Sequence, residues 1–217
     1  MIKIIILSVI LLLISACSFK SPPNQWQYKS TTAYNSYVKN FLSSNVALAR
    51  NDLSRATKYA KQSADLTMLA RIYLGVCALN ISVGVDDDCK NYVDISTLLN
   101  DKSLDAYYNF ITIKSNNSIE NLNDQYKSFA QYLNKKEFNN ANKEILKISK
   151  PTSKLLASSL MKENLTINTI NEMIETASFH GYKKSVIFWL NEKKIKTTDT
   201  DERKIISKKI SVIKSKD

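Results

Sequence analysis

The residue types that most often carry chemistry are few and widely spaced in this chain of 217 residues. His180 is the only histidine, and no His-Glu-x-x-His motif is present. Because zinc sites usually need several His or Cys ligands, we expect no metal site. A Cys–His nucleophile pair would need His180 beside Cys77 or Cys89. Since Gly181 follows His180 directly, a capping or surface role in a turn between helices is favoured.

Three consecutive acidic residues, Asp86, Asp87 and Asp88, stand just before Cys89. Their spacing lacks the alternating Asp positions, the glycine and the final Glu of a calcium-binding EF-hand. Carboxylates at the start of a helix accept hydrogen bonds from its free N–H groups. The acidic run therefore predicts helix capping. The three glycines of the chain are isolated, which excludes a Gly-rich phosphate loop.

The glutamates could serve an enzyme that cleaves the bacterial cell wall, because some all-α enzymes of this kind use a single Glu as acid. In that family the Glu begins a Glu-Ser motif. Serine follows none of the candidate glutamates here, which are Glu120, Glu137, Glu144, Glu163, Glu172 and Glu175. We therefore expect no catalytic residue and no cofactor, and a cell-wall hydrolase stays as an alternative.

The N-terminal segment has the three parts of a secretory signal peptide. Lys3 precedes an apolar run from Ile4 to Ile14 that is interrupted by Ser8. This run has 11 residues, whereas a helix needs roughly 20 to cross the hydrocarbon core. The small residues that follow mark a cleavage site, so residues 1–16 are expected to be removed.

The sequence Ile14-Ser15-Ala16-Cys17 resembles the lipobox of bacterial lipoproteins. The resemblance implies cleavage just before Cys17 and acylation of Cys17, so that the membrane holds the chain through its N-terminal lipid. In that family an Asp after the cysteine retains the protein at the inner membrane. Ser18 follows here, which favours the outer membrane, facing the periplasm, with inner-membrane anchoring as the alternative.

Residues 17–32 are polar and contain Pro22 and Pro23, which predicts an extended, lipidated tether before a helical domain at 33–217. Trp26 in this tether is expected to dock on the domain, or else to touch the bilayer interface.

Basic residues outnumber acidic ones by 31 to 20, and removal of residues 1–16 leaves a net charge of about +10. Behind a signal peptide, such a charge favours anionic partners such as lipid head groups, phosphorylated glycolipid or an acidic protein, and not nucleic acid. The alternative is a solvated Lys-rich surface without a specific partner.

Glycine and proline are scarce, three residues each, and long stretches lack the alternation of strands. The chain is therefore predicted to be all-α, with about eleven short helices in stacked antiparallel hairpins. The expected helices span 33–50, 53–64, 66–81, 89–99, one from Ser103, 119–134, 138–148, 151–162, one near 167–177, 183–193 and 199–214. The helix at 66–81 has little polar face and should be buried on several sides.

The stretch NDLSRATKYAKQSAD resembles the second helix of a tetratricopeptide repeat, with the turn at residues 51–53 and small residues at Ala56 and Ser63. KEFNNANKEILKI repeats the pattern with Phe138 and Ala141, and HGYKKSVIFWL with Tyr182 and Ser185. The separations of the small positions are not multiples of 34, so the resemblance implies a degenerate tetratricopeptide-like α-solenoid. The alternative is an irregular α bundle.

Cys77 and Cys89 remain once Cys17 is acylated, and they lie 12 positions apart across the turn SVGVDDD. Export to an oxidising compartment predicts a structural disulfide between them, and two buried free thiols are the alternative. The expected function is a membrane-anchored, periplasm-facing scaffold or assembly factor that binds an envelope protein. A ligand-binding or peptidoglycan-acting protein that uses an interhelix pocket is the alternative.

Overall fold

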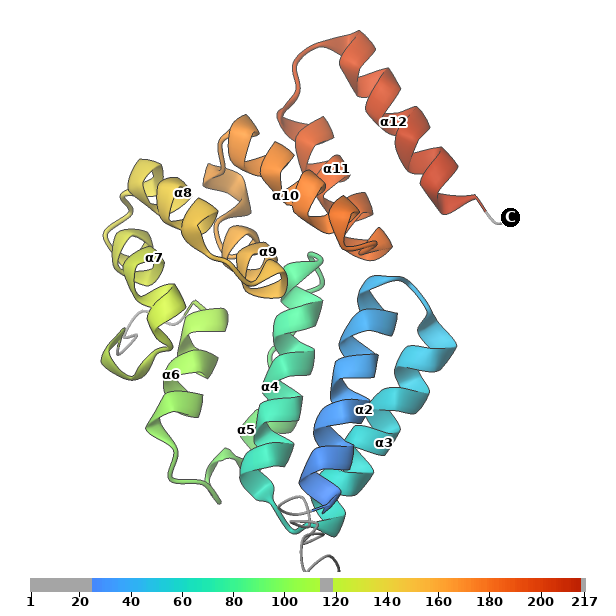
Figure 1. The fold of residues 1–217 in the computed structure, drawn as a ribbon. Coiled ribbons are helices and arrows are strands. Elements are labelled where there is room, and N and C mark those ends of the chain that lie inside the picture. The colour runs from blue at the N-terminus through green and yellow to red at the C-terminus, as the bar shows by residue number, and fades with distance from the viewer. Residues whose placement is uncertain (1–24, 114–118, 216–217) are drawn as a thin grey trace, which may run out of the picture.

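The computed structural model describes residues 25–113 and 119–215, which form eleven α-helices, two short 3-10 helices and no strand (Figure 1). This confirms the all-α prediction. The expected signal peptide, Cys17 and the first part of the tether lie outside the described residues. The helices are α2 (Gln25–Leu42), α3 (Val46–Gln62), α4 (Leu66–Ser82), α5 (Lys90–Ser96), α6 (Lys102–Ile111), η1 (Ile119–Asn121), α7 (Asp124–Asn134), α8 (Phe138–Lys147), α9 (Pro151–Ser159), η2 (Lys162–Asn164), α10 (Ile167–Phe179), α11 (Lys183–Lys196) and α12 (Thr200–Lys214).

The first described helix begins within the expected tether. Helix α2 starts at Gln25 and not at residue 33, and its early residues pack on α3. The ring centroids of Trp26 and Tyr59 are 5.9 Å apart, and the Ser30 hydroxyl donates to the carbonyl of Ala56 at 2.8 Å. Trp26 therefore docks on the domain, as expected. The predicted helices at 33–50 and 53–64 therefore had wrong bounds. Residues 25–32 look polar and were assigned to the tether, yet they bury one face against α3.

The turn expected at residues 51–53 is also wrong, since these residues lie inside α3. Asp52 is buried there. It accepts a hydrogen bond from the Asn40 side chain of α2 at 2.7 Å and forms an ion pair with Arg55. The polar Asn51-Asp52 pair resembles a helix cap, but its carboxylate joins two helices in the middle of a hairpin.

The α3–α4 turn has a left-handed residue, Ala64 (φ 52°), followed by a bond of 3.3 Å from the N–H of Asp65 to the carbonyl of Ala60. The hairpins α2–α3, α7–α8 and α10–α11 use the same turn with a shorter bond. In each of these three hairpin turns one residue adopts the left-handed conformation, and the next N–H donates to the carbonyl five residues earlier at 2.8–2.9 Å. The left-handed residues are Ser44, Lys136 and Gly181, with φ of 66°, 58° and 65°. Only Gly181 is a glycine, the residue type that favours this conformation. The repeated turn is therefore hard to predict from the sequence.

Helix α4 lies at the centre of the fold (Figure 1). It contacts α2, α3, α5, α6 and α9, and its buried side chains include Leu69, Leu74, Cys77 and Leu79. Because neighbours cover it on several sides, an apolar surface around most of the helix is stable there. This confirms the expectation for residues 66–81.

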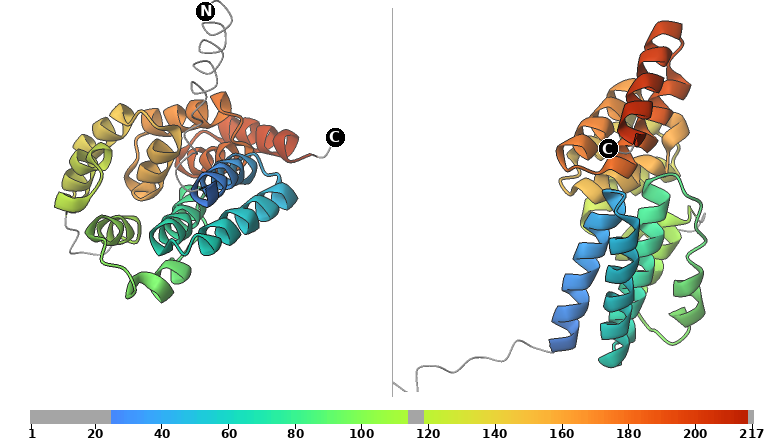
Figure 2. Two further views of the ribbon diagram at one scale, coloured as in Figure 1. Left: turned by 60° about the horizontal axis from the view of Figure 1, so that its bottom comes forward. Right: turned by 90° about the vertical axis from the view of Figure 1, so that its right-hand side faces the viewer.

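The chain curves so that its first hairpin meets its later helices (Figure 2). Helix α4 contacts α9, and α2 contacts α11. The Ser43 hydroxyl donates to the carbonyl of Gly181 at 3.3 Å, which joins the first hairpin turn to the α10–α11 turn. In an open solenoid each repeat contacts only its neighbours. The observed contacts therefore describe a hairpin array in which segments distant in sequence pack together.

Three of the small residues singled out in the sequence are at tight positions, whereas Ser63 is only half-buried at the C-terminal end of α3. Ala56 on α3, Ala141 on α8 and Ser185 on α11 are all fully buried. Each lies in the second helix of one of the three hairpins, where a small side chain lets helices approach closely. The tetratricopeptide resemblance itself stays a prediction.

Some helix starts follow ordinary capping rules, whereas the residues just before α3, α5, α8 and α11 make no capping hydrogen bond with their side chains. Pro151 is the first residue of α9, as predicted. The predicted cap Ser103 is replaced by Asp101, whose side chain accepts from the N–H groups of Ser103 and Leu104. Aspartate and serine are about equally good caps, so neighbouring candidates cannot be separated from sequence alone.

Candidate functional site

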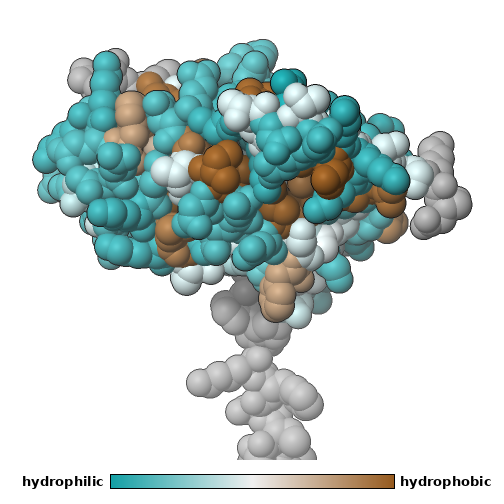
Figure 3. Space-filling view, turned by 90° about the horizontal axis from the view of Figure 1, so that it is seen from above, coloured by the Kyte–Doolittle hydropathy of each residue, from teal (hydrophilic) through white to brown (hydrophobic). Residues whose placement is uncertain are grey.

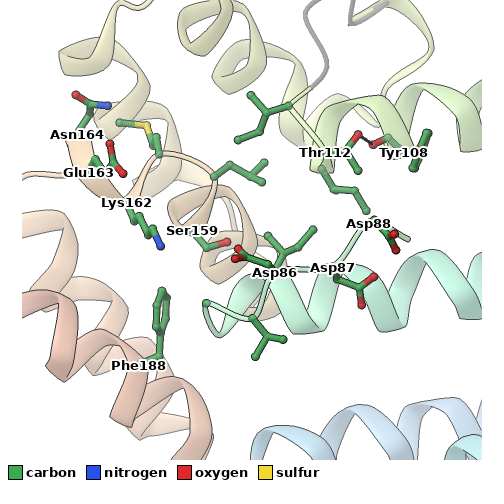
Figure 4. A pocket seen from close by; sticks show the side chains of 17 residues that line it. Asp86, Asp87, Asp88, Tyr108, Thr112, Ser159, Lys162, Glu163, Asn164 and Phe188 are labelled. Atoms are coloured by element: carbon green, nitrogen blue, oxygen red, sulfur yellow. Dashed lines mark hydrogen bonds between the residues drawn. The ribbon is translucent and has the colours of Figure 1, made fainter. Parts of the chain in front are cut away.

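A cleft of about 1160 Å³ opens between the end of α4, the end of α6, the α9–η2 segment and α11 (Figure 4). Its volume is somewhat above the range of about 300–1,000 Å³ that is usual for small-molecule sites. Several separate elements build its walls, and the polar side chains come from residues far apart in sequence. Those with polar groups are Asp86, Asp87, Asp88, Tyr108, Thr112, Ser159, Lys162, Glu163 and Asn164.

The wall formed by residues 83–89 is held in place by the two cysteines. The sulfur atoms of Cys77 and Cys89 are at bonding distance, and their Cα atoms are 5.2 Å apart. This confirms that the two residues predicted to form a disulfide face each other. The Asn80 side chain donates to Asp87 at 2.7 Å, which ties the same loop to α4. The loop therefore presents its acidic residues from a fixed backbone.

Two of the three consecutive aspartates cap the following segment, as predicted. The N–H of Cys89 donates to Asp87 at 2.8 Å, and the N–H of Lys90 donates to Asp88 at 3.0 Å. Asp86 forms no such cap among the described residues and is exposed on the cleft wall (Figure 4). The acidic run thus both starts α5 and contributes carboxylates to the cleft.

The cleft is acidic although the chain as a whole is basic. Its lining contains four carboxylates and one lysine, Lys162. Asp86 and Glu163, which come from opposite sides, are both exposed. This arrangement favours basic over acidic groups of an incoming molecule.

The possible metal ligands near this wall are used otherwise. Cys77, Asp87 and Cys89 bring potential ligand atoms within 4.8 Å of one another. Metal binding requires thiolates, whereas these two sulfur atoms are joined to each other. In the disulfide form the group is a structural link and not a metal site.

His180 lies in the α10–α11 turn, apart from Cys77 on α4 and from Cys89, which directly precedes α5. It is exposed, and its ring stacks on Tyr182 with centroids 5.4 Å apart and meets Phe179 edge-on at 5.0 Å. The surface role predicted for this histidine agrees with these contacts.

Two of the candidate glutamates, Glu172 and Glu175 of α10, line one small pocket together with Lys154 and His180. Glu172 pairs with Lys154 at 2.9 Å, Glu144 pairs with Lys147 at 2.7 Å, and Glu163 lies in the cleft.

Sequence reasoning missed Gly84 and Phe188, which close one side of the cleft. The glycine after α4 was the available signal, because without a Cβ it allows the Phe188 ring to approach closely.

No described helix is long and apolar enough to cross a membrane. No protein-family model, curated protein or solved structure matches this chain.

Proposed function

We propose that this chain is a lipid-anchored, periplasm-facing protein of the bacterial envelope that acts as a protein-binding scaffold or assembly factor. The N-terminal Ile14–Cys17 motif supports the anchor, and the Cys77–Cys89 pair fits an oxidising compartment. The observation that carries the binding role is the open cleft, because it is built from several helices and fixed by covalent and hydrogen-bonded links. A basic segment of an envelope protein is the proposed occupant.

The proposed anchor is tested by Cys17→Ala. The variant should stay an uncleaved precursor and incorporate no labelled palmitate, since both the thiol and the new N-terminus are lost. Equal labelling of wild type and variant would contradict the assignment. Fractionation of the membranes should find the protein in the outer membrane, and Ser18→Asp should move it to the inner membrane.

The proposed binding role is tested by affinity capture from detergent-solubilised envelope after cross-linking. Wild type should retain one partner in stoichiometric amount. The double variant Asp86→Lys, Glu163→Lys should lose it, because the cleft then repels basic groups. Glu120→Lys, Glu175→Lys is the matched control, since it makes the same charge change at exposed residues outside the cleft.

The cleft is also large enough to hold a small ligand or a peptidoglycan fragment, which makes a ligand-binding protein the second candidate. Native mass spectrometry separates the two candidates. A bound small molecule, absent from the Asp86→Lys, Glu163→Lys variant, would favour the second one, whereas a stoichiometric protein supports the scaffold.

A further inference from the structure

Helix α12 is covered on only part of its apolar surface. Ile206 and Ile210 are buried against Leu190 of α11. Ile205 and Val212 lie two turns apart along α12 and are 56% and 66% exposed. Exposed large apolar residues that share a helix surface with a buried stripe mark a possible contact site.

The exposed residues border a groove of about 540 Å³ between α12 and the α10–α11 hairpin. Its lining is mainly apolar: Ile174, Val186, Leu190, Ile205, Val212 and Ile213. Leu190 at its base is buried, whereas Ile205 and Val212 stand at its edge. Figure 3, which views the molecule from above Figure 1, shows apolar side chains in separate groups within a mostly polar surface.

The charge beside this groove is positive. Lys208 and Lys209 line it and are exposed, and neither forms an ion pair with a residue that the structure describes. The acidic residues of α12 are already paired, Asp201 with Lys204 at 3.0 Å and Glu202 with Lys193 at 3.1 Å. Nothing on α12 itself therefore neutralises the two lysines beside the apolar lining.

We propose that this groove binds an amphipathic helical segment of a partner protein, with acidic side chains that meet Lys208 and Lys209. Apolar side chains at helical spacing would fill the groove, and carboxylates beside them would pair with the lysines. The proposal rests on the scaffold function but uses a surface separate from the acidic cleft.

Two other occupants fit less well. In a symmetric antiparallel contact with a second copy, Ile205 would face Val212, and the central Lys208 and Lys209 would face their own copies. Like charges placed opposite each other disfavour that contact. A flat lipid surface would reach Ile205 and Val212 but not the buried Leu190, whereas a ridge of side chains can enter the groove.

The test uses the full chain in nanodiscs of zwitterionic lipid and a fluorescent helical peptide made of Leu, Ala and Glu. A peptide with Gln in place of every Glu is the charge control. The variants are Ile205→Ser, Val212→Ser and, separately, Lys208→Gln, Lys209→Gln. The matched control is Ile195→Ser, because Ile195 is 73% exposed but lies outside the groove.

Fluorescence anisotropy should show saturable binding of the acidic peptide. Each variant should weaken it about ten-fold or more, which corresponds to about 1.4 kcal/mol, and Ile195→Ser should not. The Gln peptide should bind the wild type about as weakly as the acidic peptide binds the lysine variant. No saturable binding of the acidic peptide, equal binding of both peptides, or an equal loss in Ile195→Ser would overturn the proposal.

A vesicle experiment addresses the lipid alternative. Binding to phosphatidylglycerol vesicles that falls in the same variants, without saturable peptide binding, would assign the surface to lipid and overturn the proposal. Failure of the groove is also distinct from failure of the scaffold function. If groove variants still capture the envelope partner in full, and the acidic peptide does not bind, the groove proposal is wrong and the scaffold function stands.

Discussion

The ring of Phe188 on α11 lies directly against Gly84, so a Cβ at position 84 would overlap ring atoms. Gly84 also has φ of +75°, in the left-handed region that favours glycine. This contact joins the loop after α4 to α11 and closes one side of the acidic cleft.

The first prediction is that Gly84→Ala destabilises the fold by about 2–4 kcal/mol, because left-handed strain and overlap with Phe188 both contribute. Gly181→Ala is the control for strain alone. Its φ is +65°, but no atom lies within 4 Å of the added Cβ, so a loss of about 1 kcal/mol is expected. Urea denaturation measures the free energy of unfolding of both variants. In a Phe188→Ala background, Gly84→Ala should cost no more than Gly181→Ala, and an unchanged cost there would contradict the contact.

The second prediction concerns Ser185, one of the small residues of the tetratricopeptide-like pattern. Among the described residues, Ser185 Oγ and Trp189 Nε1 are buried without a hydrogen-bond partner. Since a buried unsatisfied hydroxyl is unfavourable, Ser185→Ala should raise the free energy of unfolding by about 1 kcal/mol. The control is Ser158→Ala. Ser158 is equally buried but donates to the Lys154 carbonyl at 2.9 Å, so its removal should lower stability. If Ser185→Ala and Ser158→Ala changed the free energy of unfolding in the same direction, this interpretation would be refuted.

The third prediction is that the Cys77–Cys89 link stabilises the fold by about 3 kcal/mol, because it closes a short loop of the unfolded chain. The variant Cys77→Ala, Cys89→Ala should show this loss in urea denaturation, and reductant should then have no further effect. Thiol counting on denatured, unreduced protein should find neither cysteine free. Two free thiols with bound zinc would instead indicate a metal site made of these cysteines and Asp87.

Sequence patterns predicted the helices more reliably than the turns between them. The centre of α4 and the start of α9 followed from an unbroken apolar surface and from Pro151, which are local signals. The hairpin turns did not, because Ser44 and Lys136 adopt a left-handed conformation that nothing in their identity requires. The Asn51-Asp52 pair was misread as a turn because its partner, Asn40, lies on another helix.

The candidate site shows the same division. The pairing of Cys77 with Cys89 was predictable, since loop length and compartment restrict it. The cleft was not, because it brings Asp86 together with Glu163 through the contact between α4 and α9, and no local pattern encodes that contact. Local sequence therefore restricts which residues can cap a helix, and tertiary packing determines which residues share a surface.

The fourth prediction is a loss of stability at alkaline pH that arises from buried tyrosines. Burial, with a smaller effect of Asp87, raises the pKa of Tyr37 to about 12, and burial raises the pKa of Tyr34 still further. Burial and a hydrogen bond from Tyr92 to Asp105 (2.6 Å) also raise the pKa of Tyr92. Because the neutral form is favoured in the folded state, the stabilisation is complete below the unfolded pKa near 10.

That stabilisation should fall as the pH rises from about 10 through 12, since unfolding then releases protons. Urea denaturation across this range should show a falling free energy of unfolding. Tyr37→Phe should make the fall shallower, whereas Tyr28→Phe, the control, should leave it unchanged. A stability that is flat between pH 10 and 12 would contradict the assignment.

The fifth prediction separates the two sides of α12. Ile206 is 3% exposed and packs on α11, whereas its neighbour Ile205 is 56% exposed on the groove side. Ile206→Ala should therefore lower the free energy of unfolding by about 2–4 kcal/mol, through lost burial and the cavity left behind. Ile205→Ala should change it by less than about 0.5 kcal/mol, because little apolar surface is buried there. If both variants were equally destabilising, Ile205 would be part of the core and could not line a free docking groove. If neither variant were destabilising, α12 would not be packed as a terminal cap on the hairpin array.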